Sequence, residues 1–134
     1  MIDEGRPLFI QIAETIEESI LDGSLAEEAQ APSTNELAAF YRINPATAAK
    51  GVAVLTDKGV LIKRRGIGMF VAAGARGILL AERRTSFAEK FIDPLIAEAR
   101  TLGLDDDDLT ALLRERSARF EGAENAASTE GNHP

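Results

Sequence analysis

Residues 32–51, "PSTNELAAFYRINPATAAKG", contain two helix starts in close succession. Ser33 is followed three residues later by Glu36, which is the reciprocal capping pair that satisfies the free amides of a helix N-terminus. Asn44 is a second good cap, and Pro45 suits the first helical position behind it. A turn of about three residues that contains Arg42 separates the two helices. Two short helices joined in this way predict a helix-turn-helix.

The second of these helices ends at Gly59 and has two contrasting faces. At about 100° per residue, the apolar face carries Ala48, Val52 and Leu55. The opposite face carries Ala46, Lys50 and Ala53. A small and basic outer face offers little to a protein core and no bulk that prevents entry into a major groove. The alternative is an ordinary exposed face with good helix propensity.

The flanking segments extend this unit. Apolar residues at helical spacing between Pro7 and Gly23 predict an amphipathic helix before it. Behind it, "VLIKRRGIGMFVAA" (60–73) predicts a two-stranded hairpin whose turn holds Gly66 and Gly68. The two glycines tolerate positive φ and allow close backbone approach to a ligand. The turn is not a phosphate loop, because it lacks a third glycine, a following helix and a Gly-Lys-Ser/Thr sequence.

The charge pattern supports a special role for this region. The chain has a net charge of -7, yet residues 37–71 hold six cations against the single carboxylate of Asp57. Such a window is either an ordinary solvated surface or the footprint of a phosphate backbone. A basic hairpin directly behind a helix-turn-helix is the layout of a winged helix. The second reading is therefore the stronger one, although an inert basic turn stays open.

Four ordered blocks carry a resemblance to a known family: "PLFIQIAETIEESILDGSL", "PSTNELA", "INPATAAKG" and "KRRGIGMFV". Together they resemble the winged-helix domain of the GntR family of bacterial transcription regulators, in the form of its small YtrA-type subfamily. The resemblance covers residues 7–71 closely and extends more loosely to about 116. It implies a homodimeric repressor that binds a two-fold symmetric double-stranded DNA operator. The DNA-binding residues that it implies are Ser33, Thr34, Asn35, Asn44, Pro45, Ala46, Thr47, Lys50, Arg64, Arg65, Gly66 and Gly68.

The C-terminal third has a different pattern, with apolar residues that keep one helical phase from Ala75 to Leu102. We expect one long helix that bends at Pro94. Proline cannot donate a hydrogen bond to the Lys90 carbonyl, and this loss bends a helix more readily than it shifts the phase of the apolar residues along it. This row of apolar residues, or apolar stripe, exceeds what a small domain covers by itself, so a second helix and a symmetry mate are its expected partners. The dimerisation residues that the stripe predicts are Leu80, Phe87, Phe91, Leu95 and Leu102.

A further helix is expected over 105–116, where four aspartates favour the positive end of the helix dipole. A metal site is the weaker interpretation of these aspartates, because adjacent carboxylates point around a helix and no glycine or closing glutamate follows at the spacing of a calcium loop. Beyond Phe120 the sequence has little to bury and predicts a disordered tail, with His133 at the surface. The resemblance implies that this helical part serves dimerisation. Crevices between two subunits near Arg84, Phe87 and Phe91 leave room for a small-molecule effector whose chemistry the sequence does not indicate.

The sequence thus predicts a mainly α-helical protein with a small β-hairpin, in which a winged helix-turn-helix domain is followed by a helical dimerisation segment. The predicted ranges are 1–73 for the DNA-binding domain, 74–120 for dimerisation and 121–134 for the tail. The chain has no cysteine and one histidine, and it shows no grouped catalytic residues, cofactor motif or metal site. No membrane span or signal peptide is expected, so the predicted location is the cytoplasm. The competing function is a winged-helix module that binds protein without sequence-specific DNA binding.

Overall fold

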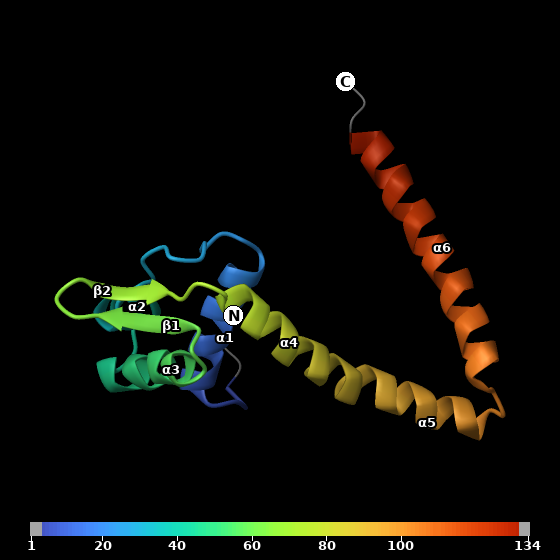
Figure 1. The fold of residues 1–134 in the computed structure, drawn as a ribbon, viewed down its shortest axis with the longest axis horizontal. Coiled ribbons are helices and arrows are strands. Elements are labelled where there is room, and N and C mark those ends of the chain that lie inside the picture. Colours follow the sequence, from blue (N-terminus) through green and yellow to red (C-terminus); the bar gives the residue numbers. More distant parts are fainter. Residues whose placement is uncertain (1–3, 132–134) are drawn as a thin grey trace. The chain divides into compact units, whose positions relative to one another are not determined.

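The computed structural model describes residues 4–131 of the chain, and the side chains up to residue 124 (Figure 1). The chain divides into two compact units, Met1–Thr85 and Ser86–Pro134. In chain order the elements are α1 (Leu8–Leu21), α2 (Thr34–Tyr41), α3 (Pro45–Asp57), β1 (Leu61–Arg64), β2 (Gly68–Val71), α4 (Ala75–Phe87), a π-helix η1 (Ala88–Ile92), α5 (Asp93–Thr101) and α6 (Asp106–Gly131). The mainly helical fold with one small hairpin is confirmed.

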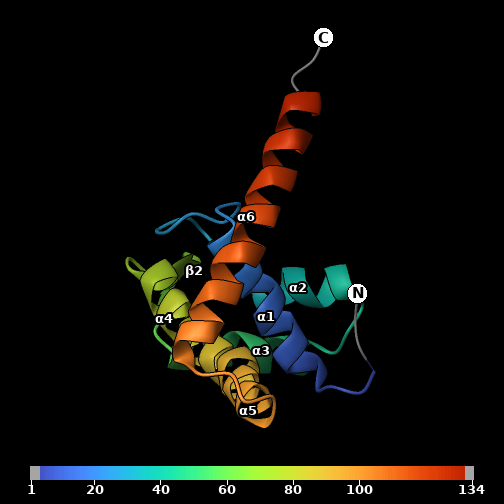
Figure 2. The same ribbon diagram turned by 90° about the vertical axis from the view of Figure 1, so that its right-hand side faces the viewer.

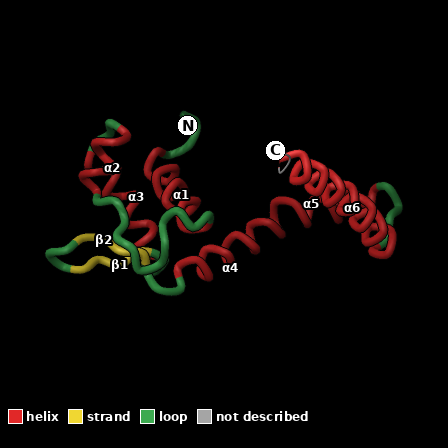
Figure 3. Tube along the Cα trace, turned by 90° about the horizontal axis from the view of Figure 1, so that it is seen from above, coloured by secondary structure: helices red, strands yellow, loops and turns green. Residues whose placement is uncertain are grey.

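The first unit is a winged helix. Helices α1, α2 and α3 enclose its core, and the hairpin of β1 and β2 follows α3 (Figures 1 and 3). The strands are antiparallel, with Leu61 opposite Val71 and Arg64 opposite Gly68. The fully buried side chains at the centre are Ile12, Ile20, Leu55, Val60, Leu61 and Val71. They come from α1, α3 and the base of the hairpin, so the same apolar cluster holds all three in place.

The connector before α2 adds a third strand-like segment to the hairpin. Its backbone pairs with β2: the Ala31 N–H donates to the Met69 carbonyl at 2.8 Å, and the Val71 N–H donates to the Ala29 carbonyl at 2.9 Å. Strand β2 is therefore bonded on both edges, by β1 and by the connector. This pairing restricts bending of the hairpin, because both strands and the connector would have to move together.

The division between the two units lies twelve residues beyond the predicted end of the DNA-binding domain at residue 73. The first turns of α4 belong to the winged-helix unit, because Ala75 and Leu79 are buried in its core. The apolar pattern is the same throughout residues 75–102, so the sequence did not indicate that only the start of this segment packs against the winged-helix core. The range 74–120 as a dimerisation domain stays a prediction.

Helical backbone continues through Pro94, but not with one uniform geometry. The π-helix Ala88–Ile92 directly precedes α5, in which Pro94 occupies the first turn. Proline has no N–H to donate to the carbonyl of Lys90, and a widened π turn accommodates the missing bond without ending the helix. Because a π turn holds more residues than an α turn, the stripe downstream of it is rotated relative to the stripe upstream. The predicted single phase is therefore wrong.

The last helix is longer than predicted. Helix α6 runs to Gly131 as one element, where we expected a helix over 105–116 and disorder beyond residue 120 (Figure 2). The segment is rich in alanine and glutamate and contains no proline before residue 131, so its intrinsic propensity continues the helix even though its sequence offers few large apolar residues. His133 lies outside the described residues. None of the helices in the described part is both long and apolar enough to cross a membrane.

Candidate nucleic-acid interface

The start of α2 is fixed by the capping pair that the sequence predicted. The Ser33 hydroxyl oxygen accepts from the Glu36 N–H at 3.0 Å, and the Glu36 carboxylate accepts from the Ser33 N–H at 3.0 Å. The hydrogen bond from the Ser33 backbone lowers the pKa of Glu36. The Ser33 hydroxyl keeps its own proton as a donor, and Thr34 and Asn35 follow it at the helix N-terminus. This end of α2 therefore presents donors of the kind that bind phosphate.

Helix α3 starts as predicted. The Asn44 side-chain oxygen accepts from the Ala46 N–H at 2.8 Å, and Pro45 occupies the first turn. Asn44, Pro45 and Ala46 are exposed, whereas Thr47 is half-buried. The side-chain amide of Asn44 points its NH₂ away from the cap bond, since only its oxygen serves the helix. The N-terminus of α3 is thus ordered before any partner binds.

The two faces of α3 are as the sequence predicted. Ala48, Val52 and Leu55 are buried, and Ala46, Ala49, Lys50 and Ala53 are exposed. The ammonium group of Lys50 lies 4.3 Å from the centre of the Phe9 ring. A cation–π contact at an exposed site contributes about 0.5–1 kcal/mol, so Lys50 is steadied against α1 but remains accessible. The outer face of α3 consequently presents the ammonium group of Lys50, positioned by Phe9, among small side chains.

Gly51 determines how closely α3 approaches α1, a role that the sequence analysis did not recognise. A Cβ at this position would lie 2.9 Å from the Phe9 carbonyl oxygen and 3.3 Å from the Ile12 Cβ. The helices therefore touch where residue 51 has no side chain. A glycine inside an otherwise regular helix was the available signal, because such a glycine commonly has a packing reason.

The hairpin turn brings together the predicted basic residues. Gly66 and Gly68 have φ of +77° and +136°, which confirms their expected positive φ. The Ile67 N–H closes the turn by donating to the Arg64 carbonyl at 3.0 Å. Lys63, Arg64 and Arg65 are all exposed, and the Arg64 guanidinium lies 4.5 Å from the centre of the Phe70 ring. The wing thus carries three accessible cations on a closed turn.

Gln30 braces the wing from the connector and was missed from the sequence. Its side-chain amide donates to the Ile67 carbonyl at 3.1 Å, and a Cβ at position 68 would lie 2.8 Å from the same nitrogen. Gly68 is therefore favoured by its φ, and a Cβ at this position would also displace the end of the Gln30 side chain. The two residues are far apart in sequence, so no local pattern connects them. Ile67, which is 63% exposed, is the apolar residue at the tip.

One cation of the basic window faces away from this surface. The ammonium of Lys58 bonds Glu17 at 2.9 Å and Glu82 at 2.7 Å, so its charge is compensated inside the unit. Burial lowers the pKa of Lys58, but the hydrogen bonds to Glu82 and Glu17 together raise it by more than burial lowers it. The pKa of Lys58 is therefore raised overall. The cations that remain for a partner are those of the wing together with Arg42 and Lys50.

The predicted dimerisation residues are exposed in the single chain. Leu80, Phe87, Phe91, Leu95 and Leu102 have exposed fractions between 37% and 63%. The rings of Phe87 and Phe91 contact each other, with centres 5.7 Å apart. Five large apolar side chains in water are unfavourable, and a partner surface is the usual way in which such residues are covered.

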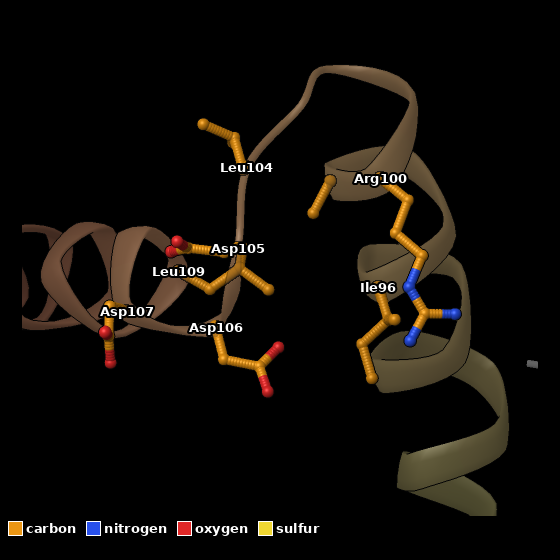
Figure 4. A pocket seen from close by; sticks show the side chains of 8 residues that line it. Ile96, Arg100, Leu104, Asp105, Asp106, Asp107 and Leu109 are labelled. Carbon is orange, nitrogen blue, oxygen red and sulfur yellow. The ribbon is translucent and has the colours of Figure 1, made fainter.

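The second unit contains an open hollow between α5 and the start of α6, of about 510 Å³ (Figure 4). Arg100 and Ile96 stand on one side of it and Asp106 on the other. The crevice expected near Arg84 between two subunits stays a prediction. Asp105 and Asp108 cap α6 reciprocally, since each carboxylate accepts the other residue's N–H at 2.9–3.0 Å. Among the described residues, no group of three or more His, Cys, Asp and Glu side chains is arranged to hold a metal ion.

A helix-turn-helix with an accessible second helix and a basic hairpin beside it defines a DNA-binding protein of the winged-helix class. Residues 9–71 match the family described as "Bacterial regulatory proteins, gntR family". Residues 9–71 therefore form a GntR-family DNA-binding domain, as the sequence resemblance indicated.

Relatives of similar length extend the likeness through the helical part. The chain is 28% identical over 116 residues to the HTH-type transcriptional repressor YtrA of Bacillus subtilis, covering 87% of this chain and 88% of that protein. A GntR-family regulator structure from Bacteroides thetaiotaomicron has 29% identity and a TM-score of 0.71, covering 84% and 98% of the two chains. A transcriptional regulator from Oenococcus oeni, at 23% identity, shares the fold with a TM-score of 0.72 over 86% and 94% of the chains.

Proposed function

We propose that the protein is a homodimeric repressor that binds a two-fold symmetric double-stranded DNA operator in the cytoplasm. The observation that carries this proposal is the accessible face of α3, small except for Lys50, beside a wing with three exposed cations. This surface is positive in a protein whose net charge is -7. The net charge of the molecule does not attract DNA, so the positive surface must determine which side of the protein faces the DNA. The similarity to a repressor supports the sign of regulation.

The residues of the interface have separate roles in this proposal. The outer face of α3 enters the major groove, where Lys50 and the Asn44 amide reach base edges and Pro45, Ala46 and Thr47 make close apolar contact. Ser33, Thr34 and Asn35 bind phosphate at the start of α2. Arg64 and Arg65 bind phosphates beside the groove, and Gly66 and Gly68 let the wing backbone approach the DNA. Base contacts supply specificity, and phosphate contacts supply register.

The helical part joins two copies in this proposal. The exposed stripe from Leu80 to Leu102 is the surface that a second copy would cover. Two winged helices related by a two-fold axis read two half-sites in opposite directions. An effector, where one acts, would bind in this helical part, where α5 and the start of α6 line an open hollow.

The proposal is tested by selecting DNA from a random pool with the purified full-length protein. Binding of the enriched sequence and of a scrambled control is then measured by fluorescence anisotropy over a range of salt. Enrichment of an inverted repeat that binds at least about 10³-fold tighter than the control is expected for a specific regulator. Equal binding of both sequences, lost together as salt rises, would refute it.

A protein-binding winged helix would give that second result, and the family match of residues 9–71 weighs against it. We also infer that the protein is not an enzyme. Several of its described carboxylates serve caps and ion pairs, among them Glu36, Asp108 and Glu17, and the matching family model describes regulatory proteins. Turnover of a substrate by the purified protein would contradict this inference.

A further inference from the structure

Helix α4 is attached to the winged-helix unit in two ways along its length. In its first turns Ala75 and Leu79 are buried, and the Arg76 guanidinium donates to the Leu21 carbonyl at 3.3 Å. No residue of α4 beyond Leu79 is buried. One turn further on, the contacts are ionic, through Glu82 and through the pair of Arg83 with Glu18 of α1. The apolar attachment therefore acts as a pivot, and charges determine the direction of the helix beyond it.

The Lys58 cluster, formed by Lys58, Glu17 and Glu82, is the centre of this ionic attachment. Lys58 is the C-cap of α3, Glu17 lies on α1 and Glu82 lies on α4, so one ammonium group joins three helices. The Lys58 and Glu17 side chains are 30% and 13% exposed, whereas Glu82 is 51% exposed. Solvent screens the outer bond more than the inner one. The lysine is thus held firmly by Glu17 within the winged helix and binds Glu82 of α4 from there.

We propose that Lys58 is a positioning residue that fixes the direction in which α4 leaves the winged helix, and thereby sets the half-site spacing that the dimer accepts. This inference rests on the proposed function, because spacing has a meaning only for a dimer on a two-fold operator. Leu80 and Phe87, two of the proposed dimer contacts, lie on α4 itself. A tilt of α4 about Leu79 changes the separation of the two recognition helices in such a dimer.

The geometry of DNA makes this separation a sensitive quantity. One added base pair moves a half-site by about 3.4 Å along the axis and rotates it by about 35°. A dimer whose α4 is held in one direction loses affinity for an operator with such a shifted half-site. A dimer whose α4 can tilt freely adapts to the new spacing and keeps its affinity. Lys58 touches no DNA in this arrangement, so it changes spacing preference without changing the affinity of one winged helix for one half-site.

The first test measures affinity for a set of operators in which the spacing of the selected inverted repeat is changed by one and by two base pairs. The full-length wild type is compared with Lys58→Met and Glu82→Gln, with Glu89→Gln as the matched control at an exposed carboxylate further along the chain. We expect one base pair to cost the wild type and the control at least about tenfold in affinity, and the two variants less than about threefold. Wild-type spacing profiles in both variants would overturn the inference.

The second test needs no DNA. Because the chain has no cysteine, single cysteines introduced at the exposed positions Ala39 and Thr85 provide unique sites for spin labels. The labelled chain is diluted into excess unlabelled protein, so that only distances within one chain are measured. A narrow distribution in the wild type that broadens with Glu82→Gln is expected, and identical distributions would contradict the role of the cluster. If the wild type selected no inverted repeat, the proposed function itself would fall, an outcome distinct from a variant that merely keeps the wild-type spacing.

Discussion

The same substitution, glycine to alanine, should have opposite effects on stability at Gly51 and at Gly77. Both positions are helical, so alanine gains about 0.5–1 kcal/mol from helix propensity at each. At Gly77 no atom lies within 4 Å of the added Cβ apart from the adjacent residues and the backbone of its own helix, so the gain is realised in full. At Gly51 the added Cβ would meet the Phe9 backbone oxygen at 2.9 Å and the Ile12 Cβ at 3.3 Å. Neither atom belongs to the flexible end of a side chain.

The magnitude at Gly51 follows from these two terms. Overpacking a well-filled core costs about 1–3 kcal/mol, because side chains and backbone must shift. After the propensity gain, Gly51→Ala should lower the free energy of unfolding by about 1 kcal/mol. Gly51→Val adds two methyl groups at the same place and should lower it by more than about 2 kcal/mol. Gly77→Ala should raise it by about 0.5–1 kcal/mol.

Urea denaturation followed by tyrosine fluorescence is a suitable assay, because Tyr41 is the single tyrosine in a chain without tryptophan and lies partly buried in the winged-helix unit. The signal therefore reports the unit that contains both glycines. Displacement of α3 should also weaken operator binding in Gly51→Ala but not in Gly77→Ala. A Gly51→Ala protein as stable as Gly77→Ala would refute the reading of the α1–α3 contact.

Three further outcomes are expected. Lys50→Ala should weaken operator binding by about 1–3 kcal/mol if Lys50 meets a base edge, and unchanged affinity in a titration would remove it from the interface. Arg65→Ala should weaken all DNA sequences similarly and reduce the slope of log affinity against log salt by about one, whereas a loss confined to the operator would contradict a phosphate contact. The lowered pKa of Glu36 means that its capping contribution is present above its ordinary pKa of 4.5 and is lost as pH falls through the lower folded value. Urea titrations below pH 4.5 should therefore show the wild type losing stability relative to Glu36→Gln, and parallel pH profiles would exclude this role.

The elements that the sequence predicted correctly depend on neighbours along the chain. Ser33 caps α2 through Glu36, only three residues away, and Asn44 caps α3 through Ala46, two residues away. Positive φ at Gly66 and Gly68 follows from a turn that leaves few other residues possible. The buried face of α3 follows from helical periodicity alone. Each of these features was visible because its partners lie in the same short segment.

The C-terminal part shows the limit of the same reasoning. Periodicity located the helical segment from Ala75 but could not reveal the π turn before Pro94, since a widened turn changes the backbone and leaves no signature in side-chain type. Low apolar content predicted disorder beyond Phe120, where helix propensity prevails up to Gly131. Burial and propensity pointed in different directions here, and the sequence pattern weighted burial too heavily.

The sequence by itself determined the winged-helix class, the positions of both helix caps, the positive wing and the family. These features depend on local hydrogen bonds, on periodicity and on the sign of charge, and all three are properties of short stretches. Only the tertiary structure decided that Gly51 seats α3 on α1, that Gln30 braces the wing across 37 residues, and that Lys58 binds Glu17 across 41 residues instead of facing DNA. The physical reason is that steric contact and ion pairing fall off within a few ångströms, so they depend on distances in space that only the folded chain establishes.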